Sequence, residues 1–441
     1  GSAQAGSSPR VLRSLGAVGI DGDITQFCLD SPVDPHPFGG YRGKRFPNHV
    51  ATEPRMTRTL RIAMNGITGR MGYRQHLLRS ILPIRDQGGV TLPDGSKLQV
   101  EPILIGRNAE KIEALAKQHG VEHWTTDLDA AINDPATDIV FDASMTSLRY
   151  ETLAKAMRAG KHIYTEKPTA ETLAEAIDLA RIRIETGVTA GVVHDKLYLP
   201  GLVKLRRLVD EGFFGRIISL RGEFGYWVFE GDHQAAQRPS WNYRKEDGGG
   251  MTTDMFCHWN YLLEGIIGKV DTVSSQTVTH IPTRWDEQGN AYDATADDAA
   301  YGVFQMTTPQ GDPVIAQINS SWAVRVFRDE LVEFQVDGTH GSAVAGLFNC
   351  VAQQRGNTPK PVWNPDLPTT EKFREQWLPV PANADLDNGF KAQWEEFLRD
   401  VVAGREHRFD LLSAARGVQL AELGLQSSAE GRRLDVPEIS L

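Results

Sequence analysis

Cysteine is scarce in this chain of 441 residues, and its three copies, Cys28, Cys257 and Cys350, lie far apart with no metal-ligand spacing. Such sparse use argues against a disulfide framework and favours a reduced, cytoplasmic setting. Long apolar runs are also missing, so we expect no membrane partner. The net charge is −10 and no extended basic run occurs, which argues against nucleic acid as a partner.

Two catalytic signatures are absent as well. The sequence contains neither a G-x-S-x-G elbow nor a P-loop, which removes support for serine-hydrolase chemistry and for Walker-type phosphate binding. What the sequence does have is 40% hydrophobic and 24% charged residues. That balance is sufficient for a sizeable core and predicts two or three domains.

The first 55 residues differ from the rest, being rich in Pro, Gly and Ser without sustained periodicity. Gly1-Ser2 resembles the remnant of a cleaved tag, and Met56 stands directly before the first strong strand. We therefore expect residues 1–55 to be an extension, and two readings stay open. The segment is either a leader that is not part of the native protein or an arm that packs on a neighbouring subunit.

From Leu60 onward, strand-like and helix-like segments alternate, which is typical of a parallel sheet with crossover helices. A turn-rich insert at 83–97 favours a small hairpin or a surface loop. Beyond residue 192, closely spaced strands predict an open, mainly antiparallel sheet, followed by helices near 390–401 and 411–428. The expected fold class is α/β, with an N-terminal Rossmann doubly wound parallel sheet (56–192) and a C-terminal α+β domain (193–441) for substrate and oligomer contacts.

The first predicted strand runs into a glycine-rich turn that opens the first helix; its residues are Gly66, Ile67, Thr68, Gly69, Arg70, Met71 and Gly72. This strand–turn–helix context is the one in which a dinucleotide fingerprint works. Glycine lets the backbone approach a pyrophosphate, and the helix N-terminus offers N–H donors. An ordinary strand-to-helix turn is the alternative.

The second predicted strand ends in Gly106-Arg107-Asn108, without the acid that usually grips the ribose of NAD. We assign Arg107 and Asn108 to the cofactor site, where Arg107 can pair with a 2′-phosphate. The cofactor is therefore NADP or NAD, with a slight preference for NADP. Stacking of Arg107 on the adenine, or exposure to solvent, is the alternative.

Two further elements carry the candidate chemistry. Lys167 follows a predicted core strand, at the strand end where ligands of such sheets bind. Asp254 and His258 are four residues apart and share one face of a predicted helix, after the glycines Gly248 to Gly250. Histidine can take the proton of a hydroxyl group while a nearby carboxylate orients or charges its ring. A capping aspartate with a core histidine is the alternative, and we expect no metal here because Cys257 points away from the other two.

Three segments together resemble the glucose-fructose oxidoreductase, inositol dehydrogenase and MocA family: GITGRMG, GKHIYTEKP (Gly160 to Pro168) and GGGMTTDMFCHW (Gly248 to Trp259). The resemblance extends from about Thr59 to the end. It implies that Lys167, Asp254 and His258 form the catalytic set, with His258 as acid/base. It also implies a cis Lys167–Pro168 bond and a C-terminal sheet that builds oligomer contacts, so we expect a homo-oligomer, a dimer or a tetramer.

One departure from that family concerns the segment Thr146-Ser147-Leu148-Arg149, where the family usually has Asn-x-x-His. Contacts near the nicotinamide are therefore expected to differ. The predicted cofactor-binding set also includes Ser144, Glu166 and Lys167. Candidate substrate contacts are polar or aromatic residues of the second half of the chain: Lys196, Tyr198, Trp241, Tyr243 and Arg244.

The function that the sequence predicts is that of an NAD(P)-dependent oxidoreductase. It would transfer hydride between nicotinamide and a secondary alcohol or ketone of a sugar, cyclitol or related polyol. Two alternatives remain: a non-catalytic nucleotide or sugar sensor of the same fold, and an imine or biliverdin-type reductase. The substrate's identity and the physiological direction do not follow from the sequence.

Overall fold

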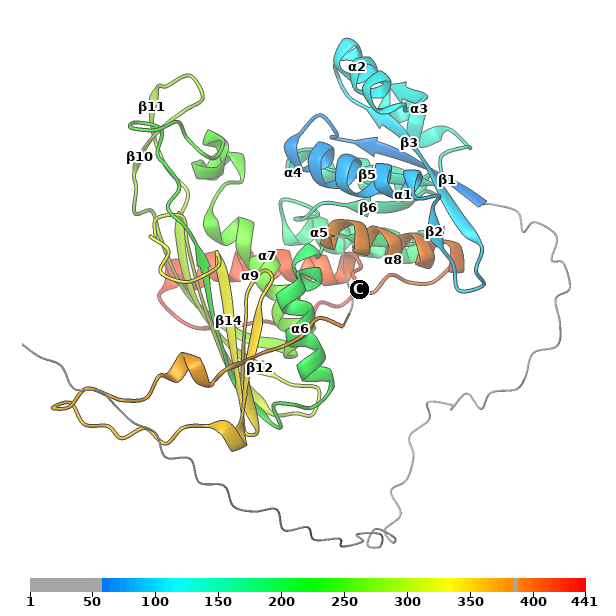
Figure 1. The fold of residues 1–441 in the computed structure, drawn as a ribbon. Helices are drawn as coiled ribbons and strands as arrows, with labels where there is room; N and C mark the ends of the chain where they lie inside the picture. Colours follow the sequence, from blue (N-terminus) through cyan, green and yellow to red (C-terminus); the bar gives the residue numbers. More distant parts are fainter. Residues whose placement is uncertain (1–57, 384–387) are drawn as a thin grey trace, which may run out of the picture. The chain divides into compact units, whose positions relative to one another are not determined.

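The computed structural model describes residues 58–383 and 388–441. The predictions for residues 1–55, Met56 and Cys28 lie outside these ranges. Within them the chain forms two large sheets with helices packed on their faces (Figure 1). No helix in the described ranges is both long and apolar enough to cross a lipid bilayer.

The first sheet is the predicted parallel one. Its strands follow the order β2-β3-β1-β5-β6-β7, with β4 also paired to β3. The strands are β1 (Arg58–Asn65), β2 (Val90–Thr91), β3 (Lys97–Ile105), β4 (His123–Thr125), β5 (Ile139–Asp142), β6 (His162–Thr165) and β7 (Ala190–Val192). All pairs are parallel except β2 with β3. The carboxyl ends of β1, β5 and β6 therefore meet at one edge, where such folds bind ligands.

Helices cover both faces of this sheet, as a doubly wound fold requires. One apolar core contains residues of the π-helix η1 (Gly72–Ile81), α1 (Leu82–Asp86), α2 (Ala109–His119) and α8 (Gly389–Ala403). The core on the opposite face contains residues of α3 (Leu128–Asn133), α4 (Thr146–Arg158), α5 (Leu173–Thr186) and α9 (Leu411–Glu430). Each face is thus completed by a helix from the C-terminal end of the chain.

The second sheet follows the order β17-β16-β15-β14-β8-β13-β12-β9-β18. Only β8 and β13 run parallel, so the sheet is mainly antiparallel, as predicted. Its strands are β8 (Ile217–Gly225), β9 (Lys269–Val278), β12 (Ala299–Thr307), β13 (Pro313–Ser321), β14 (Val332–Gly338), β15 (Gly341–Ala345), β16 (Cys350–Gln354), β17 (Leu378–Pro379) and β18 (Leu434–Asp435).

The inner face of the second sheet packs on helices α6 (Pro200–Asp210) and α7 (Met251–Ile266) and on part of α9. Buried and exposed residues alternate along β12, which shows that its other face is open to solvent. Helix α9 contributes Leu411 to the core of the first sheet and Leu420 to that of the second. It therefore connects the two cores.

Two local features differ from the sequence-based expectation. The helix after the glycine-rich turn is a π-helix, in which Ser80 Oγ donates to the carbonyl of Gln75 at 2.7 Å. The insert at 83–97 is not simply a loop, because its first part continues the helix as α1 and its second part pairs β2 with β3. The hairpin half of that expectation is confirmed.

The remaining elements are short. A two-stranded ribbon, β10 (Thr283–Trp285) with β11 (Ala291–Asp293), stands beside the second sheet. Within the described residues, five short 3₁₀-helices lie in the connections between the larger elements: η2 (Asp195–Tyr198), η3 (Ser240–Tyr243), η4 (Lys245–Asp247), η5 (Arg355–Asn357) and η6 (Phe373–Gln376). Of these, η2 and η3 carry candidate substrate contacts.

Candidate active site

The glycine-rich turn after β1 is tightly packed. Gly66 has φ +79°, and a Cβ added there would lie 2.4 Å from the backbone carbon of Ala143. A Cβ on Gly72 would lie 2.5 Å from the carbonyl oxygen of Gly66. These two positions therefore require glycine for the close approach of the turn to the end of β5 and to the helix.

The same turn leaves the N-terminal end of a helix exposed. Thr68, Gly69 and Arg70 are exposed at the head of η1, whereas the side chain of Ile67 is fully buried in the core. No side chain caps the helix at Met71, and its first turn contains no acidic residue. The positive end of the helix thus remains open to an anion, with backbone groups as the donors.

At the end of β3 the two predicted cofactor residues are placed differently. Arg107 is exposed. Asn108 is the N-cap of α2, and its side-chain oxygen accepts the N–H of Lys111 at 2.9 Å. The Asn108 side chain thus has a structural role in stabilising α2.

A buried carboxylate organises the end of β5. Asp142 is fully buried and accepts hydrogen bonds from Asn65 Nδ2 (2.8 Å) and Ser144 Oγ (2.8 Å). Arg149, from α4, lies 3.3 Å from the same carboxylate and also donates to the carbonyls of Ser144 and Pro168. The residue that departs from the family pattern therefore links the ends of β5 and β6.

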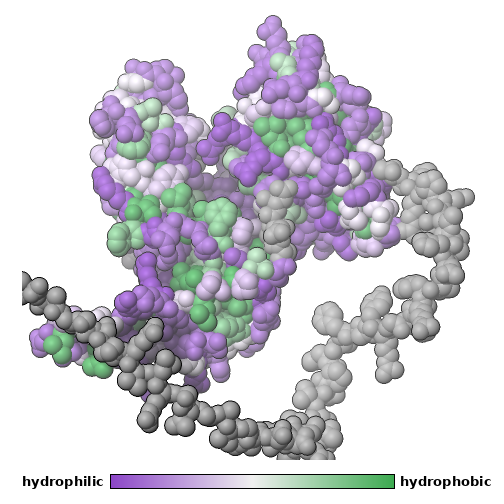
Figure 2. All heavy atoms as spheres, viewed as in Figure 1, coloured by the Kyte–Doolittle hydropathy of each residue, from purple (hydrophilic) through white to green (hydrophobic). Residues whose placement is uncertain are grey.

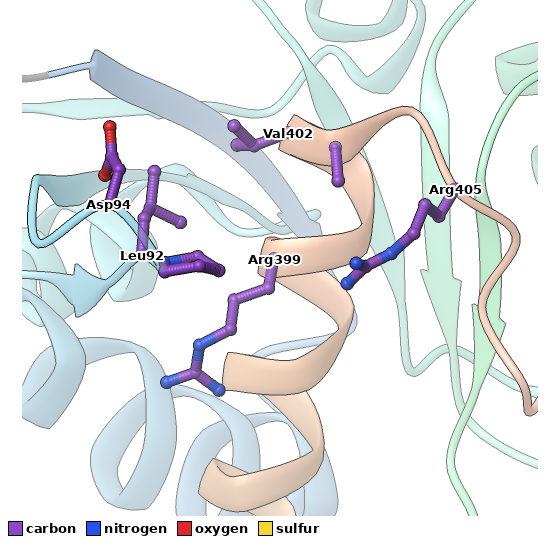
Figure 3. Close-up of a pocket in the computed structure, with 7 residues that line it drawn as sticks. Leu92, Asp94, Arg399, Val402 and Arg405 are labelled. Carbon is purple, nitrogen blue, oxygen red and sulfur yellow. The ribbon is translucent and has the colours of Figure 1, made fainter. Parts of the chain in front are cut away.

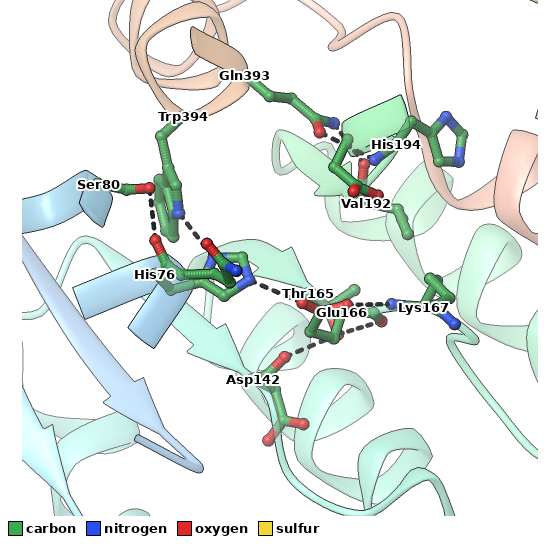
Figure 4. Close-up of polar contacts among 12 residues, drawn as sticks. His76, Ser80, Asp142, Thr165, Glu166, Lys167, Val192, His194, Gln393 and Trp394 are labelled. Atoms are coloured by element: carbon green, nitrogen blue, oxygen red, sulfur yellow. Dashed lines mark hydrogen bonds and ion pairs between the residues drawn. The ribbon is translucent and has the colours of Figure 1, made fainter. Parts of the chain in front are cut away.

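The turn after β6 is held by a second polar network, which Figure 4 shows in close-up. His76 Nε2 lies 2.8 Å from Glu166 Oε1, and the indole N–H of Trp394 donates to His76 Nδ1 at 2.9 Å (Figure 4). Because indole is only a donor, His76 carries its proton on Nε2 and donates it to Glu166. Helix α8 thus contacts, through His76, the residue that precedes Lys167.

Lys167 pairs with Asp254, as the sequence analysis anticipated for residues of one site. Its ammonium lies 2.7 Å from Asp254 Oδ1 on α7 and 3.2 Å from the Asp254 carbonyl oxygen. Arg238 binds the other carboxylate oxygen at 3.1 Å and stacks on Trp322, with its guanidinium carbon 4.0 Å from the ring centroid. The Lys167–Pro168 bond is cis, as expected.

The charges of this pair reinforce each other. Burial by itself would raise the pKa of the Asp254 carboxyl, but Lys167 and Arg238 together hold that pKa well below its usual range. Burial would likewise lower the pKa of Lys167, yet the Asp254 carboxylate raises it above its usual value. Near neutral pH the site therefore presents a charged lysine beside a charged aspartate.

His258 is buried on α7, but its partners are not the ones expected. The prediction that Asp254 orients or charges its ring is wrong, because that carboxylate is bound by Lys167 and Arg238. Instead, His258 Nε2 lies 3.3 Å from Lys196 Nζ, and Nδ1 lies 2.7 Å from the hydroxyl of Tyr261. Residues four positions apart lie on one face of a helix. Whether their side chains pair depends on the other side chains that the folded structure brings near them.

The surroundings of His258 keep its ring neutral. Burial lowers its pKa well below the usual value, and the positive charges of Lys167 and Lys196 act in the same direction. A neutral imidazole has a lone pair with which to accept a proton. This arrangement suits a general base that faces two ammonium groups.

The predicted substrate contacts are dispersed. Lys196 reaches His258, and Trp241 is exposed on η3 with 52% of its surface accessible. Arg244 stacks on Tyr292, 4.6 Å from the ring centroid. Trp241 thus exposes its ring to solvent, whereas the Lys196 ammonium lies between His258 and Asp195.

Two tyrosines from that set are engaged elsewhere. The hydroxyl of Tyr198 donates to Glu396 and accepts from Arg408. Tyr243 is buried in the core of the second sheet, where Arg284 stacks on its ring at 3.8 Å. These two tyrosines serve packing and hydrogen bonding within the protein. The sequence pattern alone cannot distinguish such tyrosines from ones that stack on a sugar.

Sequence reasoning also missed three residues of the site. Tyr261 lies three positions after His258 on the same helix, and that spacing was a usable signal. Asp195 is the neighbour of Lys196, and its carboxylate accepts from Tyr261 at 3.4 Å. Arg238 lies in an irregular segment without periodicity, so no sequence signal pointed to it.

The surface between the first sheet and the part of the chain that carries β10 and β11 is hollowed (Figure 2). A separate shallow pocket lies between the β2–β3 hairpin and the end of α8 (Figure 3). Its lining consists of Leu92, Pro93, Asp94, Arg399, Val402, Ala403 and Arg405. None of the predicted site residues is among these seven, so this pocket does not belong to the candidate site.

A Rossmann-type sheet with an open helix N-terminus, joined to a second sheet by a partly buried lysine–aspartate pair, is typical of nicotinamide-dependent oxidoreductases. Comparison with known families agrees. Residues 60–194 match the oxidoreductase family with an NAD-binding Rossmann fold, and residues 202–344 match the GFO/IDH/MocA C-terminal domain. The chain belongs to the GFO/IDH/MocA family of oxidoreductases, as the sequence analysis predicted.

Individual relatives support this assignment. The chain is 79% identical over 388 residues to D-xylose dehydrogenase of Paenarthrobacter nicotinovorans, which covers 88% of this chain and 100% of the relative. It is 26% identical over 291 residues to levoglucosan dehydrogenase of Pseudarthrobacter phenanthrenivorans, covering 63% and 71% of the two chains. The predicted activity, an NAD(P)-dependent oxidoreductase acting on CH–OH groups of sugar-like substrates, is confirmed at this level.

A solved structure shows the same fold. Levoglucosan dehydrogenase in complex with NADH superposes with a TM-score of 0.71 at 20% identity, covering 87% of this chain and 100% of that one. The agreement extends over both sheets. The predicted fold class is therefore confirmed.

Proposed function

We propose that this chain is a sugar dehydrogenase whose substrate is D-xylose or a closely related aldose. The 79% identity to a D-xylose dehydrogenase along that relative's whole length supports the substrate. The observation that carries the reaction is the Lys167–Asp254 pair beside the neutral, buried His258. In this proposal the first sheet binds the nucleotide and the part from residue 193 onward binds the sugar.

The chemistry divides among three residues. His258 Nε2 accepts the proton of the reacting hydroxyl when that hydroxyl takes the place of the Lys196 ammonium, because the neutral ring carries a lone pair on this nitrogen. Lys167 donates a hydrogen bond to the same oxygen and stabilises the negative charge that develops there. Asp254 keeps Lys167 charged and fixes its direction. A nicotinamide held at the carboxyl ends of the first sheet's strands would supply the hydride acceptor for this oxidation.

The residues at the nucleotide side fit such a cofactor. We assign the pyrophosphate to the turn 66–72, whose close-packed glycines and uncapped helix N-terminus suit an anion. Ser144 and Glu166 follow the ends of β5 and β6, and we assign them to the nicotinamide side of the cofactor site. We propose that Arg107, exposed after β3 in a position without an acidic residue, lets the site accept NADP as well as NAD.

The test is turnover with D-xylose, followed as absorbance of the reduced cofactor. We expect His258→Ala and Lys167→Ala to reduce turnover by about a hundredfold to ten-thousandfold, the usual contribution of acid/base assistance, with nucleotide binding intact. Lys155→Ala, which removes an exposed partner of Asp129, is the control and should be fully active. Near-normal turnover of His258→Ala would contradict the assignment.

Two finer properties belong to the same proposal. The outer face of the second sheet exposes Tyr301, Val303 and Ile315, each with at least 40% of its surface accessible. We propose that this face joins subunits in a homo-oligomer, a dimer or a tetramer. The free, buried thiols of Cys257 and Cys350 support a reducing, cytoplasmic setting.

A further inference from the structure

His258 has a partner at each ring nitrogen. Nε2 lies 3.3 Å from Lys196 Nζ, and Nδ1 lies 2.7 Å from the hydroxyl oxygen of Tyr261. An ammonium group has donors only, so the nitrogen that faces it must present a lone pair. The proton of the neutral ring is therefore on Nδ1, and His258 donates it to Tyr261.

Tyr261 in turn has a fixed direction. Its hydroxyl donates to Asp195 Oδ1 at 3.4 Å and accepts the backbone N–H of Lys196 at 3.4 Å. Its ring is 3% exposed and stacks on His194, with centroids 4.1 Å apart and an angle of 18° between the planes. Burial and the Asp195 carboxylate raise the pKa of Tyr261 well above its usual value, so the phenol keeps its proton and remains a donor.

We propose that Tyr261 and Asp195 are positioning residues that, together with the Lys196 ammonium at Nε2, hold His258 in its Nδ1–H tautomer, so that Nε2 keeps a lone pair for the sugar hydroxyl that takes the place of Lys196. The inference rests on the proposed function, because it takes His258 as the acid/base. Asp254 does not serve this purpose, since Lys167 and Arg238 bind both of its oxygens. The orienting carboxylate of the site is Asp195, which acts through the phenol.

The proton balance of the step is simple. One proton moves from the substrate hydroxyl to Nε2, and Nδ1 keeps its own proton. The ring becomes an imidazolium whose Nδ1–H still donates to Tyr261, and the phenol still donates to the Asp195 carboxylate. The chain of two hydrogen bonds ends in a negative charge, so it stabilises the positive ring without passing a proton along.

Kinetics of Tyr261→Phe test the positioning role. The substitution removes the hydroxyl but keeps a ring that can stack on His194. We expect kcat with D-xylose to fall about tenfold to a hundredfold, because a buried N–H without an acceptor favours the other tautomer. KM for the sugar and affinity for NADH should not change. Tyr150→Phe is the matched control, because it breaks a 2.7 Å tyrosine–aspartate hydrogen bond with Asp178 outside the site, and it should keep full kcat.

The tautomer itself can be observed without activity. In protein labelled with ¹⁵N-histidine, the His258 signals are those that disappear in His258→Ala. We expect a protonated Nδ1 and an unprotonated Nε2 in the parent protein, and growth of the Nε2–H form in Tyr261→Phe. Asp195→Asn keeps the phenol and should shift the tautomers in the same direction by a smaller amount, which covers the case in which Tyr261→Phe does not fold.

These experiments distinguish a failure of the positioning role from a failure of the proposed function. A parent protein with the proton on Nε2 overturns the inference. So does a Tyr261→Phe enzyme with normal kcat next to an inactive His258→Ala enzyme, and in that case the proposed function stands. Normal turnover of His258→Ala would overturn the proposed function and this inference together.

Discussion

Lys167 and Asp254 act as one unit, because each sets the charge of the other. Lys167 comes from the turn after β6 and Asp254 from α7, and their side chains meet at 2.7 Å. The sequence placed both in one site through their motifs. It did not reveal Arg238, the second cation on the same carboxylate, because Arg238 lies outside any helix or strand and no sequence pattern indicates its contact with α7.

The first residue-scale prediction concerns pH. In the folded protein the pKa of Lys167 lies above its usual value because Asp254 outweighs the effect of burial. Asp254→Asn removes that charge, so burial then lowers the pKa and the lysine loses its proton at a lower pH. We expect the alkaline limb of kcat/KM to move to lower pH, measured with D-xylose from neutral to alkaline buffer.

A surface substitution controls for loss of charge alone. Asp210→Asn removes an exposed carboxylate 2.8 Å from Arg206 and should leave the alkaline limb in place. An Asp254→Asn enzyme whose limb coincides with that of the parent would show that Lys167 does not depend on Asp254 for its charge.

The second residue-scale prediction concerns the cofactor. If Arg107 pairs with the 2′-phosphate of NADP, Arg107→Ala should weaken NADP far more than NAD, by roughly tenfold or more, since a charge-assisted hydrogen bond contributes about 1.5–3 kcal/mol. Calorimetric titration of both nucleotides measures this. Arg85→Ala, on the neighbouring α1, serves as the control. Equal losses for NAD and NADP would remove the argument for NADP.

At the scale of the elements, helix α8 packs its apolar face into the core of the first sheet. Its apolar stripe was visible in the sequence through the spacing of Trp394, Phe397 and Leu398. A stripe shows which face of a helix is buried but not against what, and the structure places it on the first sheet. Sequence alone also missed the π-helix Gly72–Ile81, because its side chains follow no pattern that separates it from an α-helix.

The boundaries of other elements could be predicted from the sequence because residues at their own ends determine them. Asn108 caps α2 and Gly120 ends it with φ +59°, so the helix begins and ends where the sequence indicates. The strand 162–165 matches β6 because the β-forming residues Ile163, Tyr164 and Thr165 stand between a glycine-lysine turn and the charged residues before the proline. Partners across the fold, such as Tyr261 for His258, had to come from three-dimensional structure.

The prediction for α8 addresses its contact with the turn that carries Lys167. Trp394→Phe keeps an aromatic ring but removes the N–H that His76 Nδ1 accepts at 2.9 Å. We expect the free energy of unfolding to fall by about 1–3 kcal/mol, because a fully buried acceptor is left unpaired. Turnover should fall as well, since His76 holds Glu166 next to Lys167. Urea unfolding and steady-state kinetics measure both effects.

Trp124→Phe is the matched control, because Trp124 lies on the short edge strand β4 and is 37% exposed. It should change stability little. If the two tryptophan variants unfolded at the same urea concentration, the hydrogen bond between Trp394 and His76 would contribute nothing to the stability of the fold.

At the scale of the whole molecule, the open face of the second sheet predicts assembly. Val303→Lys and Ile315→Lys place two charges where we propose that subunits meet. We expect the variant to elute as a smaller species in size-exclusion chromatography with light scattering, because lysine on such a face opposes association. Ile184→Lys, at an exposed position of α5 on the first sheet, is the control for added charge. A parent protein that is already monomeric would contradict the proposal.

The two closing helices also constrain how the molecule is made. Each face of the nucleotide-binding sheet is finished by a helix from the last fifty or so residues, α8 on one side and α9 on the other. During synthesis, the strands β1 to β7 are therefore complete before the helices that cover part of each face. The apolar surfaces of the first sheet stay partly uncovered while the second sheet is translated. Domains commonly fold in order of synthesis, but here the first domain must wait for the end of the message. We therefore expect the first sheet and the C-terminal helices to fold as one cooperative unit.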